Sequence, residues 1–295
     1  MISSANYLGG FLALFSAFLW AAASLIWNQL NKQNISPIAI SLGKTIIACC
    51  YFAATALFIG YNFPGSKNFL MLSLSGFLGI SIGDTAFFYS LKYLGPRRSV
   101  LLTVFIPVTT VLLAFLFLHE RLSFLKWLGI FICICGTIIV IQERTPDGAF
   151  INKKRGIIWA VISIISCATS ILISKVALST TGAFEASLIR LGAGGIGLFL
   201  YCVVKKGCFK GMSSLWKPKP LKLLLLSSFF GTFLGIWCFI EALKYTLASI
   251  VIVLNGISPI FILPLSYWFL REKISKRAVL GTVIAVLAGT LVIIF

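Results

Sequence analysis

The second half of this chain repeats the first. Nine residues recur 152 positions further along: Gly79, Gly83, Leu91, Lys92, Tyr93, Pro107, Leu118, Glu120 and Gly129. The stretch Gly10–Ser24 recurs at an offset of 146, and the same offset aligns Lys44 with Arg190. Repetition on this scale predicts a fold built from two copies of one unit. We place the units at residues 1–148 and 149–295.

The composition indicates a membrane protein. Hydrophobic residues make up 59% of the chain and charged residues 11%, against about 25% charged in soluble domains. The net charge is +18, but the basic residues lie mainly in short breaks between apolar runs. Loops at an anionic membrane surface explain that placement. Nucleic-acid binding is not indicated, because the sequence shows no basic face interleaved with aromatic residues.

Most of the apolar runs approach the length of about 20 residues that a helix needs to cross a bilayer. We predict ten membrane helices, at residues 7–28, 36–60, 69–91, 99–118, 125–142, 156–178, 183–204, 221–241, 248–270 and 278–295. The runs lack the period-two alternation of a membrane barrel, so the predicted fold is all-α. The cysteine pattern predicts neither a disulfide framework nor a metal site, and no cofactor is expected.

Five helices in each copy is an odd number. If the first copy enters the membrane from one side, the second enters from the other, and the two become inverted repeats. Inverted repeats are typical of carriers that alternate access around a site near the midplane of the membrane. The alternative is a duplication that only enlarged a structural bundle.

Doubled motifs connect the chain to a known family. They are Ser90-Leu91-Lys92-Tyr93, Pro107 and His119-Glu120-Arg121-Leu122 in the first copy, and Ala242-Leu243-Lys244-Tyr245, Pro259 and Arg271-Glu272-Lys273-Ile274 in the second. With them, the whole chain resembles the drug/metabolite transporter superfamily, in its ten-helix branch with two EamA repeats. The resemblance implies export or exchange of small metabolites. It also implies a role for Arg190, which matches the family's second-helix arginine, whereas the first copy has Lys44 there.

Three ionisable residues lie deep in the predicted helices: Lys44, Asp84 and Arg190. Such groups are costly in hydrocarbon and usually face a cavity or a partner. Lys44 and Asp84 fall at similar depths of antiparallel helices, which allows either a substrate site or a static ion pair. Arg190 has Glu185, Glu241 or a ligand anion as candidate partners. Asp84 is the candidate proton carrier, and proton coupling itself is left open.

Other side chains are candidates to shape the site. Trp20, Tyr89, Trp237 and Asn255 are expected to line a substrate pathway, with hydrogen bonding between helices as the alternative. Pro107 and Pro259 occupy equivalent positions inside predicted helices, where they serve as gating hinges or as fixed bends. The repeated Gly-x-x-x-Gly faces predict close packing of helices. Glu120 and Glu272 are expected to make structural contacts.

We therefore expect a secondary transporter of small organic solutes, amino acids first, whose cationic site favours a carboxylate or a phosphate. A lipid or lipid-linked-sugar flippase is the alternative, and an integral-membrane enzyme has little support because no nucleotide or zincin motif is present. The expected location is a bacterial-type inner membrane. Alternate connections carry 18 basic residues against 5 elsewhere, which places both termini outside the cytoplasm, whereas the family resemblance implies the reverse. Self-association is left open.

Overall fold

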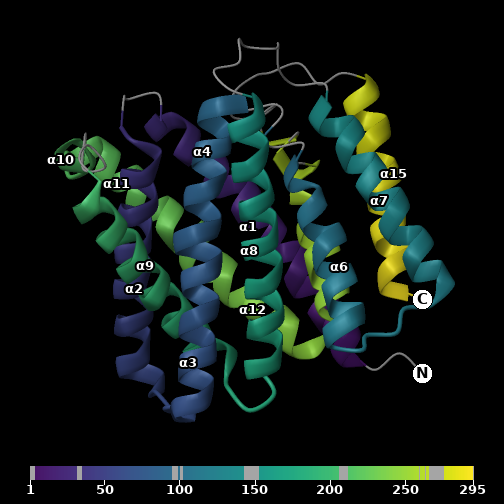
Figure 1. The fold of residues 1–295 in the computed structure, drawn as a ribbon, viewed down its shortest axis with the longest axis horizontal. Coiled ribbons are helices and arrows are strands. Elements are labelled where there is room, and N and C mark those ends of the chain that lie inside the picture. The colour runs from purple at the N-terminus through teal and green to yellow at the C-terminus, as the bar shows by residue number, and fades with distance from the viewer. Residues whose placement is uncertain are drawn as a thin grey trace.

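Helices make up the described part of the protein. The computed structural model describes residues 4–31, 35–94, 99, 102–142, 153–205, 212–258, 260–262, 264–265 and 276–294. Within these ranges there are helices and turns but no strands, so the all-α prediction is confirmed there (Figure 1).

The described helices fall into two series. The first series is α1 (Ser4–Asn31), α2 (Pro37–Ile59), α3 (Gly65–Gly76), η1 (Phe77–Asp84), α4 (Thr85–Leu94), α6 (Phe105–Phe117) and α7 (Phe124–Gln142). The second series is α8 (Lys153–Ala177), α9 (Ala183–Val204), α10 (Met212–Leu215), α11 (Pro218–Ser227), η2 (Ser228–Leu234), α12 (Gly235–Tyr245), α13 (Ala248–Asn255) and α15 (Lys276–Ile294).

Six of the described helices are long and apolar enough to span a membrane. They cover Asn6–Trp27, Ile38–Ile59, Gly65–Ser90, Lys153–Ala177, Ala183–Val204 and Pro218–Tyr245. Shorter apolar helices lie at Phe105–Phe117, Phe124–Gly136, Ala248–Ile262 and Val279–Ala288. The structure thus supports a multi-pass membrane protein, and the full set of ten spans stays a prediction.

Two of the predicted helices contain a π-helical segment that sequence periodicity did not suggest. The expected run 69–91 is a helix over residues 65–94 with η1 at its centre, and the expected run 221–241 covers residues 218–245 around η2. A π-helix bonds each amide to the carbonyl five residues back and is frequent at functional sites. The two π segments occupy nearly equivalent positions of the repeat, beside its paired glycines.

Other helix limits also differ from the predictions. In the expected run 99–118, a turn at Val104 precedes α6. In the expected run 248–270, α13 ends at Asn255 and a two-residue turn follows. The short helix α10 lies in a polar connection where no helix was expected.

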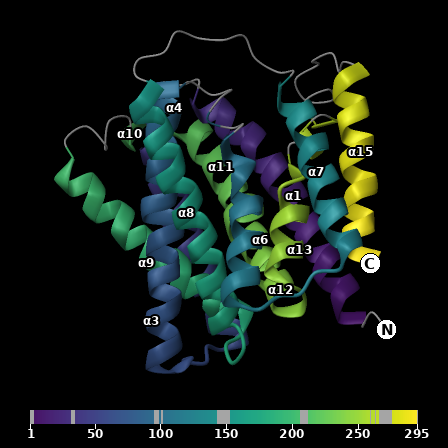
Figure 2. The same cartoon turned by 45° about the vertical axis from the view of Figure 1, so that its right-hand side comes forward.

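Equivalent helices make equivalent contacts. The helix α1 packs along α11, η2 and α12, and in the same way α8 packs along α3, η1 and α4. Three further pairs join equivalent members of the two series: α2 with α9, α6 with α13 and α7 with α15. In Figures 1 and 2, α7 and α15 stand together at one edge of the bundle, and the start of α1 and the end of α15 lie at the same end of it.

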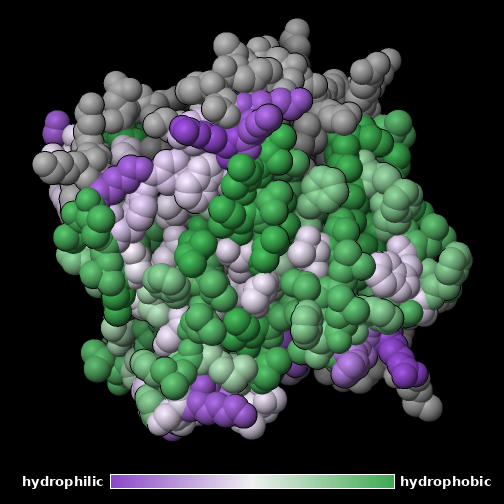
Figure 3. Space-filling model, in the orientation of Figure 1, coloured by the Kyte–Doolittle hydropathy of each residue, from purple (hydrophilic) through white to green (hydrophobic). Residues whose placement is uncertain are grey.

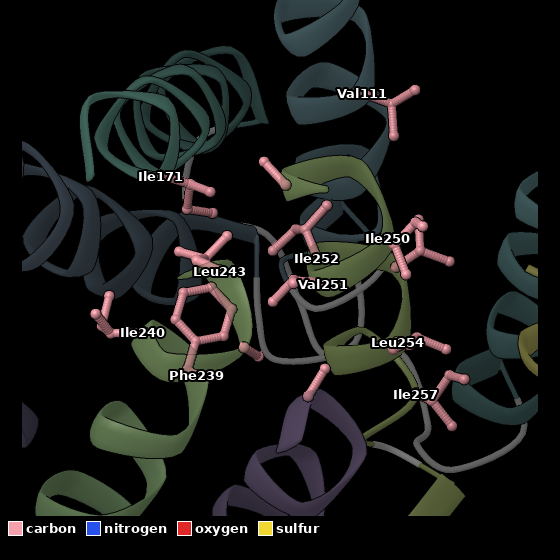
Figure 4. Packing of buried hydrophobic residues seen from close by; sticks show 14 of the residues in the cluster. Val111, Ile171, Phe239, Ile240, Leu243, Ile250, Val251, Ile252, Leu254 and Ile257 are labelled. Carbon is pink, nitrogen blue, oxygen red and sulfur yellow. The ribbon is translucent and has the colours of Figure 1, made fainter. Parts of the chain in front are cut away.

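The core lies where the two series meet. Its buried cluster is centred on α12 and α13, whose side chains pack with Ile171 of α8 and Val111 of α6 (Figure 4). On the visible outer face, hydrophobic side chains form a broad band between hydrophilic residues at the upper and lower edges (Figure 3). A surface of this kind suits a bilayer, because apolar residues meet lipid and charged residues meet the interfaces.

Candidate functional site

Arg190 is the most deeply buried cation that the structure describes in these helices. It lies in α9 with 8% of its surface exposed, and its Nη2 donates a hydrogen bond of 3.1 Å to Ser170 Oγ of α8. Its Nε is buried and has no partner in the described structure. Gly79 of η1 makes room for this pair, because a Cβ there would lie 2.5 Å from Ser170 Oγ.

No acidic side chain that the structure describes forms an ion pair with Arg190. Among the described residues, neither Glu185 nor Glu241 lies within ion-pair distance of it, so both candidate partners are wrong. Glu185, at the start of α9, lies instead near Tyr61, a residue of the connection between α2 and α3. There burial, together with the nearby Glu185 carboxylate, raises the pKa of Tyr61. The guanidinium is therefore a buried charge with a hydroxyl as its recorded partner, an arrangement that suits a bound anion.

A cluster of serines surrounds the Arg190 partner. Ser75 Oγ of α3 donates to the Ser170 carbonyl at 2.6 Å, and Ser170 Oγ donates to the Ser75 carbonyl at 2.7 Å. Ser75 Oγ also lies 2.7 Å from Ser174 Oγ. Ser170 and Ser174 are four residues apart and share one face of α8, whereas nothing in the sequence marks Ser75 as their partner. The serines form a polar seam that fixes α3 against α8 beside the arginine.

Lys44 belongs to the first series, in α2, whereas Arg190 belongs to the second. Its Nζ sits 4.4 Å from the ring centre of Trp27 in α1, within the range of a cation–π contact. It interacts electrostatically with Asp84. Within the described structure, however, the two groups form no ion pair shorter than 4 Å, so the static ion pair expected as an alternative is wrong. The Trp27 ring packs against Gly231 of η2, inside the bundle.

Asp84 ends η1 and is half-buried. Its neighbours on α8 include Cys167, which lies close to both Asp84 and Arg190. Gly83 allows this close approach, because a Cβ there would lie 2.7 Å from Cys167 Sγ, and its carbonyl accepts a 2.9 Å hydrogen bond from Ser163. The two predicted charges Lys44 and Asp84 thus share one region with Arg190, centred on η1.

Tyr89 belongs to a different group, around the middle of α4. Its ring stacks on Trp159 of α8 at 4.8 Å, and its hydroxyl hydrogen-bonds to the Tyr201 hydroxyl of α9. Lys205, just after α9, places its Nζ 4.2 Å from the Tyr89 ring centre. Sequence reasoning missed these three partners, because none of them is near Tyr89 in the chain.

Trp20 and Asn255 hold helices together. The Trp20 indole donates a 2.7 Å hydrogen bond to the Gly231 carbonyl of η2. Asn255 Nδ2 donates to Ser16 Oγ at 3.2 Å, and Ser16 Oγ donates to the Gly235 carbonyl at 2.9 Å. These are the interhelical bonds that the sequence left as the alternative to a pathway. A lining role for either residue stays a prediction.

Trp237 is part of an aromatic group where α2, α9, η2 and α12 meet. Its ring lies edge-on to Phe184 at 5.3 Å and tilted towards Phe233 at 5.8 Å and Phe52 at 6.5 Å. The indole is half-buried. Its aromatic partners on α2 and α9, Phe52 and Phe184, belong to the same helices as Lys44 and Arg190.

Of the two equivalent prolines, the structure describes Pro107. Pro107 is the third residue of α6, and the helix is interrupted at Val104. Because Pro107 has no N–H, it offers no backbone bond to the Thr103 carbonyl, which accounts for a break at this place. The Pro107 ring lies near Gly256, at the contact with α13. Pro259 lies outside the described residues, so the hinge pair stays a prediction.

Glu120 makes the structural contact expected of it, and it reaches across the molecule. It is 6% exposed, and its carboxylate accepts bonds from the Ala248 amide at 2.8 Å, the Ser249 amide at 3.2 Å and Ser249 Oγ at 2.6 Å. A carboxylate here caps α13 and complements its dipole. The preceding residue, His119, has a φ of 52°. Glu272 lies outside the described residues.

Lys175 of α8 binds the backbone where α12 ends, just before α13. Its Nζ donates to the Leu243 carbonyl at 2.5 Å and to the Thr246 carbonyl at 2.7 Å. A cation thus closes the C-terminus of α12 while Glu120 closes the N-terminus of α13. This arrangement is structural, and it leaves Arg190 and Lys44 as the cations near the centre.

Comparisons with known proteins agree with this arrangement of helices. The model of the EamA-like transporter family matches residues 7–142 and again residues 154–295. An uncharacterized transporter of Archaeoglobus fulgidus is 26% identical over 292 residues, covering 96% of this chain and 97% of that protein. Protein LicB of Haemophilus influenzae is 26% identical over 204 residues, 66% of each chain. A solved crystal structure, 15% identical, superposes with a TM-score of 0.80 over 99% of this chain and 96% of the other.

Proposed function

Because this chain belongs to the EamA-like transporter family, we propose that it is a secondary transporter of small organic solutes that carry a carboxylate or a phosphate, amino acids first among them. The family implies a membrane transporter with a small-molecule substrate, and it points away from an enzyme. The proposal adds the cargo, the site and the mechanism.

The observation that carries the proposal is that Arg190 is buried and pairs with no acidic side chain of the described residues. A guanidinium buried without a carboxylate is unfavourable unless something satisfies it. The Nε of Arg190 has no partner in the described structure, and its Nη2 bonds to Ser170 Oγ, so other N–H groups of the guanidinium are available to a ligand. Arginine binds a carboxylate or a phosphate through two parallel hydrogen bonds. Lys44, which rests on a tryptophan ring, would supply a second positive charge.

Alternating access would follow from the doubled architecture. We propose that residues 1–148 and 149–295 are inverted repeats and that the substrate binds between them. Support comes from the recurring helix contacts, in which α2 meets α9 and each π segment meets the first helix of the other series. Trp20, Tyr89, Trp237 and Asn255 would border the pathway, and Pro107 and Pro259 would bend as it opens.

A thermal-stability screen of the detergent-purified protein tests the proposed cargo. The ligands would be amino acids, phosphorylated metabolites, nucleotide sugars and lipophilic cations. A ligand that binds the folded state alone stabilises it by about 2.7 kcal/mol at a hundredfold excess over its dissociation constant. We expect stabilisation by at least one anionic class, and loss of that effect in Arg190→Gln.

The matched control is Arg121→Gln, which removes an exposed arginine from the connection between α6 and α7. It should respond to the ligand as the wild type does. Stabilisation that survives in Arg190→Gln would reject the proposed site. Stabilisation by lipophilic cations alone would reject the proposed anionic cargo.

Asp84 would carry the proton if transport is proton-coupled. Asp84→Asn should then abolish uptake driven by a pH gradient while counterflow of the same ligand continues, because counterflow needs no net proton movement. Glu185→Gln is the control, since Glu185 lies near Tyr61 and away from Arg190. Unchanged pH dependence in Asp84→Asn would remove the proton from the mechanism.

A further inference from the structure

A groove of about 550 Å³ runs along the outside of the bundle, away from Arg190. One stripe of α11 and η2 forms most of its wall, and Tyr51 of α2 contributes the rest. The lining residues are Tyr51, Pro218, Leu221, Lys222, Leu225, Leu226, Phe229 and Phe230. Leu225 is 39% exposed and Leu226 is 46% exposed. In a membrane-spanning segment, such a surface faces lipid hydrocarbon.

Tyr51 lies between α2 and the α11–η2 helix, beside the groove. Its hydroxyl donates a 3.4 Å hydrogen bond to the Leu225 carbonyl, and its ring lies edge-on to Phe229 at 5.4 Å. A bulky side chain on α2 therefore rests against the α11–η2 helix. The groove lies beside this contact.

The equivalent place in the other series is closed. The repeat aligns Tyr51 with Gly197 of α9 at the offset of 146. A Cβ at Gly197 would lie 2.1 Å from Ser81 Oγ and 2.7 Å from Phe77, so α9 packs directly against η1. A tyrosine would not fit there. The groove is thus a feature of one series and not of the shared fold.

The lining has the chemistry of a phospholipid site. Leucine and phenylalanine side chains make a long apolar wall, and Lys222 is the one charged residue among the lining residues. Lys222 lies in the second turn of α11, one turn after the exposed Lys217 and Lys219 at its start. An amine at the start of a membrane helix is placed to meet a lipid phosphate, while the apolar wall receives an acyl chain.

We propose that this groove binds one anionic phospholipid, with its acyl chain along Leu225, Leu226 and Phe230 and its phosphate at Lys222. The proposal is independent of the cargo, because the groove and the Arg190 site share no residue. It predicts a preference for an anionic headgroup, since a zwitterionic lipid brings no net negative charge to the lysine.

Native mass spectrometry of the purified protein with phosphatidylglycerol or phosphatidylcholine tests the site. We expect one phosphatidylglycerol molecule to be retained, about fivefold more tightly than phosphatidylcholine, the effect of one lysine near an anionic surface. Lys222→Gln should remove that preference. Lys67→Gln should leave it intact, because Lys67 lies in the first turn of α3, where it is the equivalent of Lys219, in the series without the groove.

A second pair of variants tests the groove itself. Leu226→Trp fills it and should weaken retention of either lipid by about fourfold or more, as expected from losing at least one buried methylene contact. Leu74→Trp alters the equivalent lipid-facing position of α3, which is 51% exposed, and should change nothing. Both positions face outward, so both variants should fold.

Three results would overturn the proposal. They are equal retention of the two lipids by the wild type, equal weakening by Leu74→Trp and Leu226→Trp, and a dimer that Leu226→Trp disrupts. The second result would indicate an unspecific lipid shell. The third would indicate that a second copy of the chain covers the groove.

Discussion

Two helical seams are built from equivalent residues, yet their serines bond in different directions. In the seam of α3 with α8, Ser75 and Ser170 exchange hydrogen bonds across the two helices. In the seam of α11 with α1, the equivalent Ser227 donates to the Leu224 carbonyl and Ser24 donates to the Ala21 carbonyl, each within its own helix.

Aromatic side chains occupy the second seam instead. Trp20 and Trp27 pack against Gly231 and Gly235, where the first seam places Ser170 and Cys167 against its glycines. The glycine faces and the helix contacts are therefore repeated, while the polar network beside Arg190 exists in one seam. A duplicated backbone can thus carry an asymmetric binding site, because packing constrains the glycines and leaves the facing residues free to differ.

The largest expected effect comes from moving a residue of one seam into the other. Gly76 of α3 corresponds to Ser228 at the start of η2. A Cβ at Gly76 would lie 2.0 Å from the Arg190 carbonyl oxygen, a backbone atom that has little freedom to move. Gly76→Ser should lower the free energy of unfolding by about 3 kcal/mol, as overpacking does. Thermal unfolding of the purified protein measures the change.

The reverse exchange provides the control. Ser228→Gly removes a buried hydroxyl that lacks a partner in the described structure, and it adds a flexible glycine at a cost of about 1 kcal/mol or less. Equal losses in the two variants would mean that the seams are packed alike, contrary to the geometry.

The polar network should give the next largest effect. Ser170→Ala removes the bond that Ser170 Oγ donates to the Ser75 carbonyl and leaves Nη2 of Arg190 without its hydroxyl partner, which should cost about 2 kcal/mol. Ser24→Ala is the matched variant in the other seam and should cost about 0.5 kcal/mol, because its bond stays within one helix turn. A cost for Ser24→Ala as large as that for Ser170→Ala would contradict the asymmetry.

Much of the fold was predictable from the sequence, because membrane helices must be long and apolar and repeats must pack alike. The apolar runs predicted the six long apolar helices that the structure describes, and the glycines at 79 and 83 predicted a close helix contact, whose partner is α8. Arg190 was also identifiable, since an ionisable residue deep in an apolar run has few roles.

The partners of these residues were not predictable. Identical serines at 75 and 227 bond in different directions, and only the packing of the facing helix decides which. Glu120 finds Ala248 across 128 positions of sequence, and Tyr89 finds Tyr201 across 112. The π segments were missed because hydrophobic periodicity does not distinguish a bond to the fourth residue back from one to the fifth.

The smallest expected effect concerns the cation–π contact between Lys44 and Trp27. The equivalent cation, Arg190, has a serine hydroxyl as its partner instead. The repeat places Ile173 where the first copy has Trp27, so Trp27→Ile gives Lys44 the neighbour that the other series has. A double-mutant cycle with Lys44→Met should show a coupling of about 1 kcal/mol in thermal unfolding, the usual size of a partly exposed cation–π contact.

The control cycle pairs Lys44→Met with Trp20→Phe, because the Trp20 ring stacks on Phe239 and its indole bonds to Gly231. Its coupling should stay within about 0.3 kcal/mol, as for residues that are not in contact. Equal coupling in the two cycles would mean that Lys44 responds to the general packing of α1. Coupling confined to Trp27 would mean that an aromatic ring holds the lysine of one series in place, as a serine hydroxyl holds the arginine of the other.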